Sequence, residues 1–240
     1  MKVDRVASLA EATTLESIGA GMIGVEIAPN PRFADSRTVT VDQAAQIRQM
    51  LRNSTLTVSM DLGTDPDHVV RLALRSGADF VQPLTSGIPP HPVRVALRDA
   101  GIGIVYAGVE ISHDDDPGWI FSAHDGTPDL NAAFFQVEVL PEYRDSWAFL
   151  RDRSPEFEEE FQIEDLDELG GSHPLIAGLD LGPGNVGQIA TSLPRVRGLS
   201  LTLAERTERT DVHFHSFSEA TAALEAASPD GLRAFGRTAR

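Results

Sequence analysis

Short apolar runs rich in β-branched residues alternate along the chain with segments that have the spacing of amphipathic helices. Apolar runs of this kind, bounded by turn residues, predict buried strands. The predicted strands are Lys2–Val6, Met22–Ala28, Thr55–Asp61, Phe80–Pro83, Gly103–Ala107, Ala133–Val139, Leu175–Gly178 and Gly198–Leu203. Strands that alternate with helices predict a parallel α/β fold, either closed into a ring or spread as an open sheet.

The starts of several helices carry local signals. Ser8–Glu11 and Thr40–Gln43 fit the capping box, in which the first and fourth side chains bond each other's backbone N–H. Asp65 followed by Pro66 fits a first helical turn, and Ser216 opens the last predicted helix. Asp145–Gly171 breaks this rhythm, because it is strongly acidic; we interpret it as a solvated face without a clear helix.

The length of 240 residues fits one domain of the α/β-barrel size class, which we expect to span residues 1–228, with a frayed tail over 229–240. The formal net charge of −16 argues against nucleic acid or an anionic membrane as a partner, since both need a cationic surface. No run has the length of a membrane span, and the first residues lack a signal-peptide pattern. We therefore expect a cytoplasmic protein that binds a small molecule.

The composition excludes some chemistry. There is no cysteine, so no disulfide, thiolate nucleophile or zinc-thiolate site can form. Lys2 is the only lysine, and we place it before the first strand, which argues against a Schiff-base mechanism that needs a buried amine.

Several stretches, in order, resemble phosphoribosylanthranilate isomerase, over roughly residues 1 to 226. They are Lys2–Asp4 with Ser8–Ala12, Gly19–Gly24 with Pro29–Arg32, Ala44–Ile47, Ala78–Gln82, and Leu175–Leu179 with Gly184–Val186. The resemblance implies a closed (β/α)₈ barrel with its active site at the carboxyl ends of the strands. It also implies an intramolecular isomerase of amino-acid biosynthesis that needs no organic cofactor, as a monomer or homodimer, on a small substrate with or without a phosphate.

The resemblance also implies site residues. The family's catalytic base is a cysteine on the first strand, and Asp4 stands there; the acid that ends the sixth strand falls on Gln136 or Glu138, of which only Glu138 can donate a proton. Arg32 lies in the loop that holds the substrate carboxylate. The other implied substrate-binding positions are Gln82, Gly178, Gly184 and Asn185. The glycines of the family's phosphate loops are replaced by Leu179 and by Leu203-Ala204, which obstruct a phosphate.

Each carboxylate also has a structural interpretation. Asp4 could form a salt bridge with Lys2 or Arg5 at the barrel rim, and Glu138 could be an exposed acid beside Arg144. Both readings stay open alongside the acid/base interpretation.

Two other functions remain. A metal-dependent lyase or isomerase would use strand-end acids and a His-x-His pair, although a solvent-facing His pair is the simpler reading and we expect no metal. The residues concerned are Glu26, Asp61, Glu138, His213 and His215. The second alternative is a non-catalytic barrel that serves as a binding or scaffolding subunit.

Overall fold

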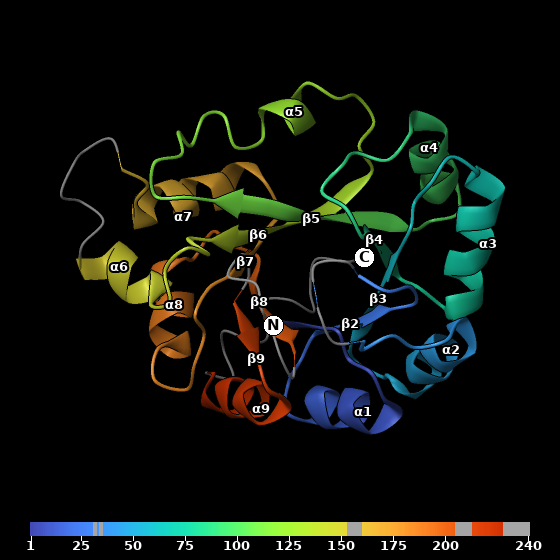
Figure 1. The fold of residues 1–240 in the computed structure, drawn as a ribbon, viewed down its shortest axis with the longest axis horizontal. Helices are drawn as coiled ribbons and strands as arrows, with labels where there is room; N and C mark the ends of the chain where they lie inside the picture. Colours follow the sequence, from blue (N-terminus) through green and yellow to red (C-terminus); the bar gives the residue numbers. More distant parts are fainter. Residues whose placement is uncertain (31–32, 34–35, 153–159, 205–212, 228–240) are drawn as a thin grey trace.

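The computed structural model describes residues 1–30, 33, 36–152, 160–204 and 213–227. Eight parallel strands follow one another around a barrel, which the pairing of β1 with β8 closes, and the helices surround it (Figure 1). The barrel strands are β1 (Lys2–Asp4), β2 (Met22–Glu26), β3 (Thr55–Met60), β4 (Phe80–Pro83), β5 (Gly103–Ile111), β6 (Ala132–Val139), β7 (Leu175–Gly178) and β8 (Gly198–Leu203). A further short strand, β9 (Phe214–His215), pairs with β8. This is the predicted single-domain (β/α)₈ barrel, and closure decides against the open sheet.

The helices cover the outside of the barrel. They are α1 (Leu9–Ser17), α2 (Val41–Met50), α3 (Pro66–Ser76), α4 (His91–Asp99), α5 (Ser122–Asp125), α6 (Ser146–Asp152), α7 (Ile163–Ser172), α8 (Val186–Ser192) and α9 (Phe217–Ala226). Thr40 and Ser216 form the complete capping boxes of α2 and α9, and Asp65 caps α3. The cap signals therefore placed these helix starts correctly. Within the described part of the chain, no helix has the length and apolar character needed to cross a membrane.

Three expectations about elements were wrong. The acidic segment after Asp145 contains two helices, α6 and α7, and α7 buries Leu166 and Leu169 against the barrel. Strand β5 extends to Ile111, beyond the expected end at Ala107. The short strand β9 was not expected, and it pairs with β8. The expected tail over 229–240 lies outside the described residues.

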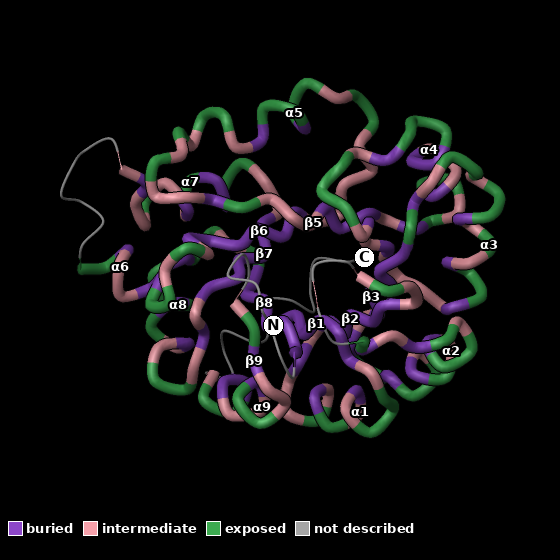
Figure 2. The backbone as a smooth tube through the Cα atoms, in the orientation of Figure 1, coloured by how far each residue is buried: buried purple, intermediate pink, exposed green. Residues whose placement is uncertain are grey.

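Lys2 is the first residue of β1, as in the predicted strand Lys2–Val6, so its placement before that strand was wrong. Its side chain is 0% exposed, and its Nζ reaches the side chains of Gln82 on β4 and Gln136 on β6. Neither strand neighbours β1 in the sheet, so Lys2 points into the barrel, as does Asp4 two residues later. Figure 2 shows the strands largely buried and the outer surfaces of the helices exposed. The barrel interior therefore contains charged groups that are shielded from solvent.

Candidate active site

Asp4, at the end of β1, is a buried carboxylate with both oxygens hydrogen-bonded. The Lys2 ammonium donates to both of its oxygens, and Gln136 Nε2 donates to Oδ2 at 3.0 Å. The same ammonium donates to Gln82 Oε1 at 2.9 Å. Gln82, which was predicted to bind the substrate, is therefore bonded to Lys2 in this structure. Burial lowers the pKa of Lys2, while the charge of Asp4 opposes that change. The ion pair with Lys2 is thus present, but inside the barrel and not at its rim.

Two glycines make room for two buried carboxylates, Asp4 and Glu138. A Cβ on Gly24 of β2 would lie 2.0 Å from Asp4 Oδ1, and one on Gly178 of β7 would lie 2.6 Å from Glu138 Oε2. Real Cβ atoms do not approach so closely. Any larger residue at either glycine would therefore displace the carboxylate beside it. For Gly178, which pairs with Glu138 across β6 and β7, this is a direct structural requirement.

Glu138 lies near the end of β6 and is 4% exposed. Its Oε2 accepts a long hydrogen bond of 3.5 Å from the backbone N–H of His213 and lies 3.9 Å from His213 Nδ1. The alternative of an exposed acid is therefore wrong, because the side chain is buried and faces a histidine. His213 and His215 are also not a solvent-facing pair: the His213 side chain is 10% exposed, and His215 is buried.

A second buried ion pair, between Arg5 and Glu26, lies beside β2. Arg5 Nε donates to Glu26 Oε2 at 3.2 Å, Arg5 Nη1 donates to the carbonyl of Leu203 at 3.0 Å, and the guanidinium lies 3.7 Å from the centre of the Phe33 ring. Asn30 Nδ2 donates to the other oxygen of Glu26 at 2.9 Å. Burial raises the pKa of Glu26, and the charge of Arg5 opposes this. Glu26 is thus committed to contacts within the protein.

The strand-end acids do not converge as a metal site would require. Asp61 is exposed beyond β3, whereas Glu26 is bonded to Arg5 and Glu138 faces His213. Among the residues that the structure describes, no three His, Asp or Glu side chains are grouped so that they could hold a metal ion.

The loop between β7 and α8 is bonded to itself. Asn185 Oδ1 accepts from the N–H of Gly182 at 2.7 Å, and Asn185 Nδ2 donates to the carbonyl of Asp180 at 2.9 Å. The N–H groups of Asn185 and Val186 both donate to the carbonyl of Gly182, at 3.2 and 3.0 Å. The backbone donors of this turn, where Gly184 also lies, are therefore largely used within the turn.

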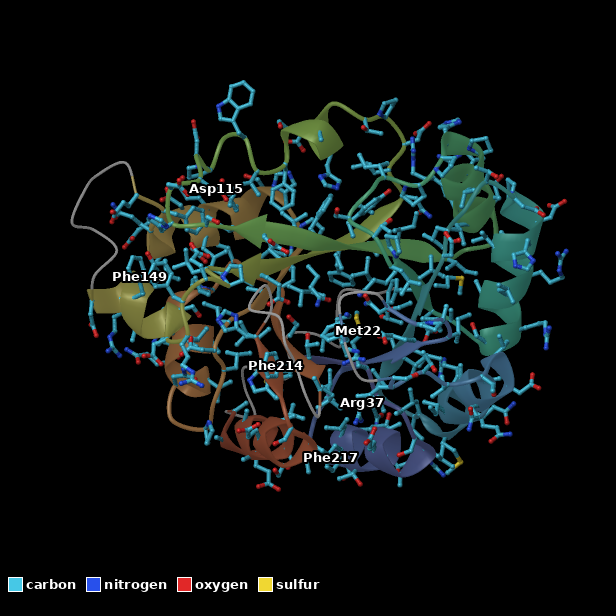
Figure 3. The ribbon with its side chains drawn as sticks, viewed as in Figure 1. Met22, Arg37, Asp115, Phe149, Phe214 and Phe217 are labelled. Carbon is cyan, nitrogen blue, oxygen red and sulfur yellow. The ribbon has the colours of Figure 1, made fainter. Side chains whose placement is uncertain are left out.

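The end of β8 is covered by β9. The N–H of Ala204 donates to the carbonyl of His215 at 3.0 Å, and His215 Nε2 lies 2.7 Å from the carbonyl oxygen of Leu181. Burial lowers the pKa of His215, which favours the neutral ring that donates to this carbonyl. Figure 3 shows Phe214 of β9 beside the barrel, with Phe217 of α9 further from its centre. Phosphate sites in such barrels commonly use the loops after strands seven and eight. Here several of those N–H groups already have partners.

The structure thus brings some of the predicted site residues into contact with one another's partners and places others elsewhere. Asp4 and Gln82 share the Lys2 ammonium, and Glu138 adjoins Gly178. Gly184 and Asn185 lie in the self-bonded turn, and Arg32 lies outside the described residues. Sequence reasoning missed Lys2 as part of the site, although its spacing of two from Asp4 on one strand was the available signal.

The comparisons with known proteins were made on sequence and on structure. No protein-family model and no curated protein sequence matches the chain. Solved structures do match it: phosphoribosyl anthranilate isomerase from Thermus thermophilus superposes with a TM-score of 0.61 at 17% identity, covering 94% of this chain and 96% of that one.

Two further structures show the range of the similarity. Phosphoribosyl anthranilate isomerase in complex with reduced 1-(o-carboxyphenylamino)-1-deoxyribulose 5-phosphate has a TM-score of 0.61 at 14% identity, covering 94% of this chain and 96% of that one. A 3-hexulose-6-phosphate synthase has a TM-score of 0.54 at 13% identity, covering 95% and 99%. At these identities the similarity establishes the fold, and the chain shares the barrel of the phosphoribosylanthranilate isomerases that its sequence resembles.

Proposed function

We propose that this chain is an intramolecular isomerase of the aldose–ketose type, acting on a sugar amine by acid and base catalysis in amino-acid biosynthesis. The observation that supports this most is the pair of buried carboxylates, Asp4 and Glu138, each seated where a glycine on the neighbouring strand leaves space. They come from β1 and β6, which are not neighbours in the sheet. A substrate between them would meet one group on each side.

In this proposal Asp4 is the base and Glu138 is the acid. Rearrangement of an aldose amine needs a proton delivered to the ring oxygen and a proton removed from C2. Asp4 suits removal, because Lys2 and Gln136 both donate to its carboxyl oxygens and fix its orientation. A correctly placed acid or base contributes about 10²–10⁴-fold to the rate.

The substrate contacts remain proposals. Arg32 is proposed to hold a substrate carboxylate, because a guanidinium matches that group with two parallel hydrogen bonds. Gln82, Gly178, Gly184 and Asn185 are proposed to face the substrate from β4 and from the end of β7.

The test measures ketose-amine formation from aldosyl amines, including N-(5′-phosphoribosyl)anthranilate and its counterpart without the phosphate. Asp4→Asn and Glu138→Gln are expected to lose about 10²-fold or more of the turnover rate. Asp61→Asn is the matched control, because it neutralises an exposed strand-end acid that has no part in this proposal. Wild-type turnover retained in Asp4→Asn would remove Asp4 from the mechanism, and no turnover by the wild-type chain would favour a non-catalytic binding role.

A further inference from the structure

His213 has a fixed ring orientation beside Glu138. It lies just before β9, and its Nε2 is 3.1 Å from the carbonyl oxygen of Tyr143 in the loop after β6. A carbonyl oxygen only accepts, so Nε2 must carry a hydrogen. In a neutral ring, the lone pair is then on Nδ1, the atom that lies 3.9 Å from Glu138 Oε2.

In this orientation two hydrogen-bond acceptors face each other. Nδ1 of the neutral ring and an ionised carboxylate oxygen would face each other without a hydrogen between them, with side chains only 10% and 6% exposed. Among the described residues, no other group hydrogen-bonds Nδ1. Burying two acceptors face to face with no hydrogen between them is costly, and one added proton on either atom removes the conflict. The geometry therefore calls for one proton held between His213 and Glu138.

The surrounding charges favour the imidazolium. Burial lowers the pKa of His213, but Glu138, the carbonyl of Tyr143 and Asp180 raise it by more, so that the net shift is upward. The nearby His215 on β9 is not a competing cation, because burial lowers its pKa and favours the neutral ring. These charges therefore favour a proton on the His213 ring where it faces Glu138.

We propose that His213 and Glu138 act as one proton-transfer pair, and that His213 Nδ1 delivers the proton in the proposed isomerase reaction. This inference rests on the proposed function. The Nδ1 proton passes to the ring oxygen as the C1–O bond breaks, and the nitrogen lone pair of the substrate forms the C1=N bond. Asp4 then takes the C2 proton, giving an enol amine. That proton returns to C1 while the enol proton goes back to His213, so the catalyst ends as it began.

The pair is tested first without any substrate. Nuclear magnetic resonance follows the ring signals of the histidines against pH in the wild type and in Glu138→Gln. We expect His213 to titrate above its ordinary pKa of about 6.5 in the wild type and at a lower pH in Glu138→Gln, where only the Tyr143 carbonyl and Asp180 still oppose the effect of burial. Exposed His68 is the internal control and should not change. A His213 that titrates at or below the ordinary value in the wild type, or that ignores Glu138→Gln, would overturn the pairing.

The catalytic part is tested by turnover. His213→Gln should lower kcat by about 10²-fold and remove the loss of rate at high pH that deprotonation of His213 causes. The matched control is His215→Gln, which can still donate to the carbonyl of Leu181 and should keep the wild-type pH profile. Turnover unaffected by His213→Gln would refute this inference alone. A wild-type chain that turns over no aldosyl amine would refute the proposed function, and the catalytic role with it, whatever the resonance titration gives.

Discussion

Removal of the Lys2 ammonium tests the energetic role of the charges inside the barrel. In Lys2→Met, the Asp4 carboxylate, 5% exposed, loses the cation that donates to both of its oxygens. The acceptors of Gln82 and Gln136 lose the same donor. Breaking a buried ion pair by removing one partner costs about 3–5 kcal/mol, because the other charge stays buried without compensation. Most of that cost should reach the free energy of unfolding, since Lys2 is 0% exposed and water cannot replace it.

The expected loss of unfolding free energy in Lys2→Met is large relative to the total stability of a domain. Domains are commonly stable by about 5–15 kcal/mol. For a chain of this size, 1 kcal/mol corresponds to about 2–4 °C, so Tm should fall by roughly 6–20 °C. Urea unfolding followed by circular dichroism measures the free energy, and calorimetry measures Tm. The matched control is Arg48→Met, which removes an ion pair with Asp79 of 2.9 Å whose side chains are 36% and 29% exposed, and which should cost at most about 1 kcal/mol.

The double variant distinguishes the energetic cost of the broken ion pair from the cost of disturbed packing. Replacing both charges, in Lys2→Met with Asp4→Asn, leaves no unpaired charge in the barrel and should restore the free energy of unfolding to within about 1–2 kcal/mol of the wild type. The two substitutions would then be strongly coupled in a double-mutant cycle. A single variant as stable as Arg48→Met, or a double variant as unstable as the sum of the singles, would refute the reasoning.

Other consequences follow from single positions. Gly178→Ala should displace Glu138 and lower turnover at least about tenfold, and overpacking should cost about 1–3 kcal/mol of stability. The control is Gly187→Ala, where no atom lies within 4 Å of an added Cβ, and it should be neutral in the same assays. His124 is buried without a hydrogen-bond partner among the described residues, and burial lowers its pKa. The neutral ring therefore contributes its full stability above the ordinary histidine pKa, and this stability is lost as the pH falls below that pKa, because only the unfolded chain then binds the proton readily. Urea unfolding at pH 7 and pH 5 should therefore show a smaller acid loss in His124→Phe, and an equal loss would exclude this histidine as the cause. Inorganic phosphate at millimolar concentration should give no saturable rise in Tm over chloride at equal ionic strength, because the N–H groups of Gly182 and Ala204 are already bonded; a saturable rise would mean that the loops reopen for an anion.

The fold was predictable because its signals are local. The caps at Thr40 and Ser216 act within four residues, and each strand is a short apolar run, so neither needs knowledge of distant contacts. The helix α7 escaped notice because its acidic residues masked Leu166 and Leu169, whose spacing of three was the correct sign. The two-residue strand β9 has no pattern of its own and exists only by pairing with β8.

The site was harder to predict, because its contacts join residues far apart in the chain. One of the two interpretations of Glu138 placed it beside Arg144, its neighbour in sequence, whereas the barrel brings it to His213, 75 residues away. Lys2 was set aside because it was placed before the first strand, outside the barrel. The alternation of Lys2, Val3 and Asp4 on one strand nevertheless puts Lys2 and Asp4 on the same face, and closure of the barrel puts that face inside.

The most direct test of the central claim follows the C2 hydrogen of the substrate. An aldosyl amine carrying deuterium at C2 is converted by the wild type and by Asp4→Asn, and magnetic resonance records the loss of deuterium from C2. Binding of a reduced, unreactive analogue, measured by thermal shift, checks that Asp4→Asn still holds the substrate. We predict that the wild type removes the C2 deuterium as the ketose amine forms and that Asp4→Asn binds the analogue but leaves the deuterium in place. Deuterium loss in Asp4→Asn at the wild-type rate would contradict the account.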